Sequence, residues 1–176
     1  MTRVLGIDPG SRKGLGWAVL ETVDSVLVEG LSTVRKVASG VVKVTGIVEG
    51  SMDRTPVWAA IFDVMGNWLW RAEENECVDA VAYEQVMRHS SVWAAHLYGG
   101  QQAMIQWWAH TMDRPTIPVA VQTVKRMLGC RASGGAKAVA MVQAAQRLGY
   151  DVSDHNEADA VGIALGGLEW MAKHPK

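Results

Sequence analysis

Residues 4–11 read VLGIDPGS, an apolar run that ends in a cluster of turn-forming residues. Because the apolar run favours buried extended backbone and Pro-Gly favours a turn, this stretch predicts a strand that ends at Asp8. Residues 14–20 form a second strand-like run. The opening of the chain therefore predicts a hairpin with a carboxylate at the end of its first strand.

Strand and helix patterns alternate along the rest of the chain. Residues 25–48 are rich in Val, Thr and Gly and favour an additional ribbon of strand. Short buried strands are predicted at residues 79–83, which end at Glu84, and at residues 117–121. Helices are predicted at residues 57–70 after Thr55 and Pro56, and at 91–112, 136–148 and 157–173. This order predicts an α/β fold with a mixed sheet covered by helices.

The composition is that of a single globular domain spanning residues 1–176. Apolar residues make up 49% and charged residues 20% of the chain, which disfavours disorder and repetitive structure. The sequence contains neither an apolar run of the ~18 residues that a membrane helix needs nor a signal peptide. Cys77 and Cys130 are interpreted as packing residues with free thiols. These features predict a cytoplasmic protein without a membrane partner.

Three carboxylates occupy positions suited to a shared metal site. Asp8 and Glu84 end strands, and Asp159 lies near the start of the last helix. Phosphodiester cleavage with two divalent cations needs several carboxylates from separate elements. Each residue also has an ordinary interpretation, because Asp-Pro-Gly-Ser is a common turn and acidic residues often cap helices or line a rim.

The residues before Asp159 leave the fourth ligand open. His155 and Asn156 lie four and three residues earlier, on the same helical face, whereas Glu157 points elsewhere. Asp154 or Asn156 is a good N-cap, in which case His155 is a solvated neighbour.

Four segments, in order along nearly the whole chain, resemble the RuvC family of Holliday junction resolvases. They are residues 5–11 (LGIDPGS), 81–86 (VAYEQV), 122–125 (QTVK) with Lys137 downstream, and 157–164 (EADAVGIA). The resemblance implies a ribonuclease H-like fold, with antiparallel opening strands followed by parallel ones in a five-stranded sheet. It also implies a homodimer that nicks four-way DNA junctions symmetrically, leaving 5′-phosphate ends, with two Mg²⁺ or Mn²⁺ ions per active site.

The resemblance also implies site residues. The family's metal-binding positions map onto Asp8, Glu84, Asn156 and Asp159, with Asn156 in place of the usual Asp or His. A shift of one residue would give that place to His155, so both remain candidates. Lys125 is the implied catalytic lysine.

The protein as a whole is not basic, because its net charge is −1. DNA contacts are therefore expected from a local rim of basic residues around the acidic site. The candidates are Arg12, Lys13, Met87, Lys125, Arg126, Arg131 and Lys137. Met87 stands where well-known family members carry an aromatic wedge, so Met87 or Trp93 is expected to unstack bases. The ordinary interpretation of the lysines is that they are solvated helix residues.

Several alternatives stay open at this point. The helix at residues 91–112 carries an aromatic stripe that suits either a dimer surface or a buried core. Rival functions are a junction-binding module that does not cut, a nuclease for structured RNA, and an actin-like nucleotide-binding domain. The sequence does not decide whether branch-migration proteins act as partners.

Overall fold

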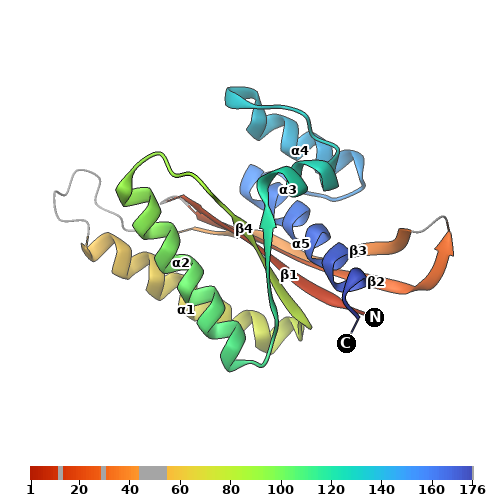
Figure 1. Ribbon diagram of the computed structural model, residues 1–176, viewed down its shortest axis with the longest axis horizontal. Coiled ribbons are helices and arrows are strands. Elements are labelled where there is room, and N and C mark those ends of the chain that lie inside the picture. Colours follow the sequence, from red (N-terminus) through yellow and green to blue (C-terminus); the bar gives the residue numbers. More distant parts are fainter. Residues whose placement is uncertain (12–13, 29–30, 44–54, 176) are drawn as a thin grey trace.

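The computed structural model describes residues 1–11, 14–28, 31–43 and 55–175. These residues build a five-stranded sheet of order β3-β2-β1-β4-β5 (Figure 1). The strands are β1 (Arg3–Ser11), β2 (Gly14–Val28), β3 (Leu31–Val42), β4 (Ala80–Gln85) and β5 (Thr116–Ala120). Strands β1, β2 and β3 pair antiparallel, whereas β4 runs parallel to both β1 and β5. The predicted mixed sheet, with an opening hairpin followed by parallel strands, is confirmed.

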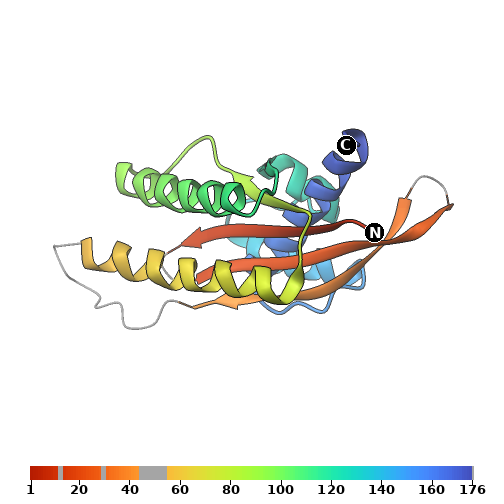
Figure 2. The same ribbon diagram turned by 90° about the horizontal axis from the view of Figure 1, so that it is seen from below.

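Helices cover both faces of this sheet (Figures 1 and 2). They are α1 (Thr55–Glu76), α2 (Val92–Thr111), α3 (Val121–Leu128), α4 (Lys137–Arg147) and α5 (His155–Lys173), with a short 3₁₀ turn at Gly134–Ala136. In the described part of the chain, no helix combines the length and the apolar character needed to cross a bilayer.

Side-chain alternation along the central strands divides the core into two. Val4 of β1 and Ala82 of β4 join the cluster that contains α3, α4 and α5. Leu5 and Tyr83 join the other cluster, which contains residues of α1 and α2. Successive strand residues point to opposite faces, so α5 packs on one face of the sheet and α1 and α2 on the other.

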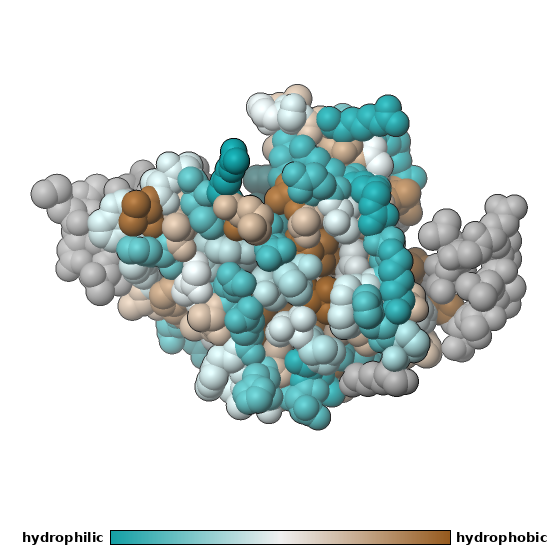
Figure 3. Space-filling model, in the orientation of Figure 1, coloured by the Kyte–Doolittle hydropathy of each residue, from teal (hydrophilic) through white to brown (hydrophobic). Residues whose placement is uncertain are grey.

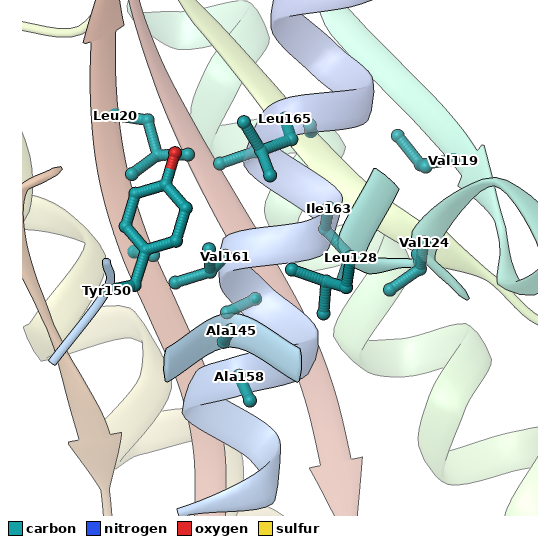
Figure 4. Close-up of a cluster of buried hydrophobic side chains, with 14 of the residues drawn as sticks. Leu20, Val119, Val124, Leu128, Ala145, Tyr150, Ala158, Val161, Ile163 and Leu165 are labelled. Atoms are coloured by element: carbon teal, nitrogen blue, oxygen red, sulfur yellow. The ribbon is translucent and has the colours of Figure 1, made fainter. Parts of the chain in front are cut away.

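Helix α5 lies unusually close to the sheet. A Cβ at Gly6 of β1 would fall 2.3 Å from the carbonyl oxygen of Ala160, and one at Gly16 of β2 would fall 2.0 Å from that of Asn156. Only glycine allows this approach of two backbones. Figure 4 shows the apolar side chains of α5 meeting those of β2, α3 and the segment around Tyr150.

Helix α3 is not among the helices predicted from the sequence, which places a strand at residues 117–121 and the next helix at 136–148. The structure begins α3 at Val121. Val124 and Leu128 lie one turn apart and are both buried, while Lys125 and Arg126 fall between them. An eight-residue helix gives too short a periodic pattern to stand out among basic residues.

The remaining elements differ from prediction mainly at their ends. Helix α1 begins at Thr55 and continues to Glu76, and α5 begins at His155, two residues before the predicted start. Cys130 is buried as expected, but Cys77 is exposed at the turn after α1, so its interpretation as a packing residue was wrong.

Candidate active site

Asp8 and Glu84 lie side by side at the carboxyl ends of neighbouring parallel strands. Ile7 of β1 pairs with Tyr83 of β4, so the next residues along each strand are level with each other. Alternation then turns the side chains of Asp8 and Glu84 toward the face that α5 covers, because Ile7 and Tyr83 belong to the opposite core. The carboxyl ends of strands are the usual place for a ligand in such sheets.

Asp159 comes from the first turns of α5. Asp154 caps this helix, since its side chain accepts a hydrogen bond from the backbone N–H of Asn156 at 2.8 Å. The close contact of Gly6 with Ala160 then fixes where the neighbouring Asp159 meets the sheet. Asp159 is 5% exposed and Asp8 is 6% exposed, whereas Glu84 is partly buried.

The three carboxylates lie near enough to one another for their charges to interact. Burial raises the pKa of Asp8 well above its usual value, and the charges of Glu84 and Asp159 raise it further. A hydrogen bond from the backbone N–H of Gly10 to Asp8 Oδ1, at 3.0 Å, acts in the opposite direction, as does Lys137. Burial and the charge of Asp159 likewise raise the pKa of Glu84.

Lys137 supplies positive charge to this acidic cluster. Its Nζ donates to Asp159 Oδ2 at 3.2 Å. Burial lowers the pKa of Lys137, but the charges of Asp159, Glu84 and Asp8 outweigh that effect and hold it above the usual value. Burial still raises the pKa of Asp159, so one ammonium group does not fully offset the desolvation of the carboxylates.

The donor set suits a hard divalent cation. The charges of Glu84 and Asp159 raise the pKa of Asp8. Asp159 Oδ1 is buried with no hydrogen-bond partner among the described residues. Carboxylate oxygens are the ligands that Mg²⁺ prefers. As the side chains stand, however, no three His, Cys, Asp or Glu residues in the described ranges form a ready metal cluster. The carboxylate oxygens therefore fit a hard cation, although Lys137 hydrogen-bonds to one of them, Asp159 Oδ2.

Both candidates for the fourth ligand lie beside the cluster. His155 lowers the pKa of Asp159 through its charge, although its side chain is half exposed. Asn156 packs against Gly16, the residue that pairs with Asp8. Glu157 instead accepts hydrogen bonds from Ser39 at 2.6 Å and from the Ser153 backbone at 3.3 Å, so it points away as predicted.

The basic candidates on α3 have other partners. Lys125 donates to the carbonyl oxygen of Ala132 at 2.9 Å, yet it lies near enough to lower the pKa of Asp159. Arg126 makes two hydrogen bonds to the carboxylate of Glu169, at 2.6 and 3.2 Å. Their roles toward DNA stay predictions.

The other predicted DNA contacts lie at the edge of the site or outside the described residues. Met87 is 80% exposed in the segment after β4. Trp93 is 51% exposed at the start of α2 and packs edge-on against Trp58, with ring centroids 5.4 Å apart. Arg131 is exposed. Arg12 and Lys13 lie outside the described residues.

Sequence reasoning assigned no role to Gly10, although it helps to hold Asp8. Gly10 has a φ of +65°, which glycine adopts without strain, and its N–H therefore turns back to the Asp8 carboxylate. The signal was present, because a glycine two residues after an aspartate is typical of a turn closed by the aspartate side chain.

The order and directions of the five strands, with helices on both faces of the sheet, define a ribonuclease H-like fold. The sequence matches no protein-family model and no curated protein sequence. Solved structures do match. Thermus thermophilus RuvC in complex with a Holliday junction substrate has a TM-score of 0.71 and 20% identity, covering 98% of this chain and 97% of that one.

Two further structures agree. Another Thermus thermophilus RuvC structure has a TM-score of 0.69 and 19% identity, with 99% and 98% of the two chains covered. The yeast mitochondrial Holliday junction resolvase Ydc2 has a TM-score of 0.63 and 19% identity, covering 99% of this chain and 81% of that one. The protein therefore has the fold of RuvC, and the resemblance noted from the sequence is confirmed for the fold.

Proposed function

We propose that this protein is an endonuclease that resolves four-way DNA junctions by nicking them. The observation that carries the proposal is the convergence of Asp8, Glu84 and Asp159 from three elements into one electrostatically coupled cluster. The fold supports it, because the similar structures are Holliday junction resolvases, one of them bound to a junction.

The proposed cofactor is a pair of Mg²⁺ or Mn²⁺ ions. Asp8, Glu84 and Asp159 would hold them, together with Asn156 or His155. When bound, such ions activate a water molecule and stabilise the leaving 3′ oxygen of a phosphodiester, which yields a 5′-phosphate end.

Lys137 has the position to balance charge during this reaction. Its ammonium group already lies against Asp159 at 3.2 Å. If a cation occupied the site, Lys137 would be available to donate to a phosphate oxygen of the DNA, where negative charge increases in the transition state. Lys125, held by Ala132 on the neighbouring segment, would support the same phosphate at longer range.

A homodimer matches the symmetry of the substrate. A four-way junction offers two related strands, and a two-fold dimer would present one active site to each. Helix α2 is the candidate dimer surface because Val92, Trp93 and Trp107 are all exposed on it. Figure 3 shows the face of the molecule on which α2 lies, with hydrophobic residues near its middle and separate ones toward its sides, among hydrophilic residues.

The direct test uses a labelled synthetic four-way junction with the full-length protein. We expect paired nicks in Mg²⁺ or Mn²⁺ that DNA ligase can reseal, and little cutting of a linear duplex of the same sequence. Asp8→Asn should abolish nicking and leave junction binding within about twofold, because DNA binding rests on contacts to other phosphates. Nicking by Asp8→Asn at the wild-type rate would reject the proposal.

One observation favours a second candidate, a module that binds junctions without cutting them. Lys137 neutralises part of the acidic cluster, and no three-residue metal cluster is preformed among the described side chains. Tight junction binding without a nick at any Mg²⁺ or Mn²⁺ concentration would support this candidate. Competition between junction DNA and RNA hairpins in the same assay separates both from a nuclease for structured RNA.

A further inference from the structure

The inner face of α2 carries polar side chains to the ends of the two catalytic strands. The hydroxyl of Tyr98 donates a hydrogen bond to the backbone carbonyl of Glu84 and accepts one from the backbone N–H of Val86, at 3.1 Å. These two backbone groups lie on either side of the point where β4 ends. One side chain therefore fixes the backbone that carries the Glu84 carboxylate.

Gln101 does the same for the strand that carries Asp8. It lies one helical turn after Tyr98 and is 2% exposed. Its Nε2 donates to the backbone carbonyl of Pro9 at 2.9 Å. Pro9 follows Asp8 directly, and the next residue, Gly10, donates its N–H to the Asp8 carboxylate. Gln101 thus stabilises the Pro9–Gly10 turn, which in turn hydrogen-bonds to the Asp8 carboxylate.

The environment of Gln101 is not what stability alone favours. Its Oε1 is buried and has no hydrogen-bond partner among the residues that the structure describes. A buried polar atom without a partner costs free energy, so an apolar side chain of similar shape would suit this position at least as well. The one hydrogen bond that the amide makes is to the active-site turn.

Tyr98 and Gln101 lie on the helix behind the two strands. Asp8 and Glu84 point toward α5, and α2 packs on the opposite face of the sheet with Tyr83 and Leu5. At the strand ends, Tyr98 and Gln101 hydrogen-bond to backbone atoms, and the Tyr98 ring also packs against His89 with ring centroids 4.9 Å apart.

We propose that Tyr98 and Gln101 are positioning residues, which together hold the ends of β1 and β4 so that the Asp8 and Glu84 carboxylates stay side by side. Because they lie at i and i+3 on a single helix, one rigid element sets the spacing of the two strand ends. The consequence for nicking rests on the proposed function, but the positioning itself does not.

The test compares Tyr98→Phe and Gln101→Met with the wild type. Both changes keep the volume and remove only the hydrogen-bonding atoms. Thr111→Val is the matched control, since the Thr111 hydroxyl bonds only to Trp107 O within α2, at 2.7 Å. Each variant is measured by thermal unfolding, amide hydrogen exchange, Mn²⁺ calorimetry and single-turnover nicking of a four-way junction.

For Gln101→Met we expect an unchanged or higher unfolding temperature. Amides at residues 6–10 should nevertheless exchange about fivefold faster, the effect of losing one hydrogen bond. Tyr98→Phe should do the same at residues 84–88. Mn²⁺ affinity should fall several-fold in both, and the nicking rate about tenfold, with junction affinity within twofold, because misplaced groups cost rate rather than binding. The control should match the wild type throughout.

Wild-type exchange at both strand ends together with wild-type Mn²⁺ affinity in the two variants would overturn the proposal. Faster exchange spread evenly over the whole chain would also overturn it, since the residues would then only stabilise the fold. If the wild-type protein nicks no junction, the proposed function fails. Exchange and Mn²⁺ affinity still decide the positioning role in that case.

Discussion

The two helical layers of this protein are built by different rules. Helix α5 packs backbone to backbone on its face of the sheet, and every residue from Ala158 to Leu168 is buried. Helix α2, on the other face, buries only five residues and exposes Trp107 by 59%. The layer that delivers Asp159 is fixed by steric fit. The layer behind Asp8 and Glu84 combines a smaller apolar contact with a few hydrogen bonds to the strand ends, and it leaves large apolar side chains exposed.

The largest expected effect comes from filling the close contact under α5. Gly6→Ala would place a methyl group 2.3 Å from the backbone oxygen of Ala160, and the backbone has no room to yield. We expect the free energy of unfolding to fall by about 3 kcal/mol, measured by urea denaturation.

The matched change on α2 should have the opposite sign. A Cβ at Gly99 meets nothing within 4 Å, so Gly99→Ala should raise the free energy of unfolding by up to about 1 kcal/mol through helix propensity. Equal changes in the free energy of unfolding for Gly6→Ala and Gly99→Ala would contradict the steric difference between the two layers.

Neutralising Asp8 should stabilise the fold in a pH-dependent way. Burial and the neighbouring charges raise its pKa in the folded state, so ionisation costs stability as the pH rises from the unfolded-state pKa, near 4, through the folded-state pKa. Asp8→Asn keeps an acceptor for the Gly10 N–H and should gain about 1 kcal/mol at pH 7.

The gain should disappear below about pH 4, where Asp8 is protonated in both states. Urea unfolding of both proteins across this range provides the measurement. The exposed Asp63→Asn on α1 serves as the control and should stay within about 0.5 kcal/mol of the wild type. A gain at pH 7 that persists unchanged in acid would contradict the electrostatic explanation.

Removing the positive charge of Lys137 should change metal binding more than it changes the free energy of unfolding. Lys137→Gln leaves Asp159 without its ion pair, so stability at pH 7 should fall by only about 0.5 kcal/mol, because the lysine is one-third exposed. The freed oxygen should bind Mn²⁺ several-fold more tightly in calorimetry. Lys125 donates to the carbonyl oxygen of Ala132 instead, so Lys125→Gln should leave the Mn²⁺ affinity nearly unchanged. Weaker Mn²⁺ binding in Lys137→Gln would show that the lysine does not compete with the metal.

The smallest effect on stability is expected on the outer face of α2. Ala103 is exposed, so Ala103→Arg should change the free energy of unfolding by less than about 0.5 kcal/mol. If α2 is the dimer surface, sedimentation should show a dimer for the wild type and a monomer for this variant. Asn67→Arg, on the exposed face of α1, should remain a dimer. A dimer in both variants would move the interface elsewhere.

Sequence reasoning succeeded where a local pattern carries the information. The strands that carry Asp8 and Glu84 are predicted by apolar runs followed by polar or turn residues, although β1 continues to Ser11 and β4 to Gln85. The N-cap at Asp154 places Asp159 within the first turns of its helix. It failed at α3, where eight residues give too little periodicity, and at Cys77, whose exposure depends on what packs around it.

By itself the sequence determined the order of the strands and of the four longer helices and pointed to the three carboxylates, because these follow from short-range periodicity and from residue type. Only the tertiary structure decided that Lys137 meets Asp159, that Arg126 meets Glu169, and which helix supports the strand ends. Those contacts join residues 12 to 92 positions apart, and no local pattern specifies them. They arise when the glycines of β1 and β2 admit α5 on one face of the sheet and α2 covers the other.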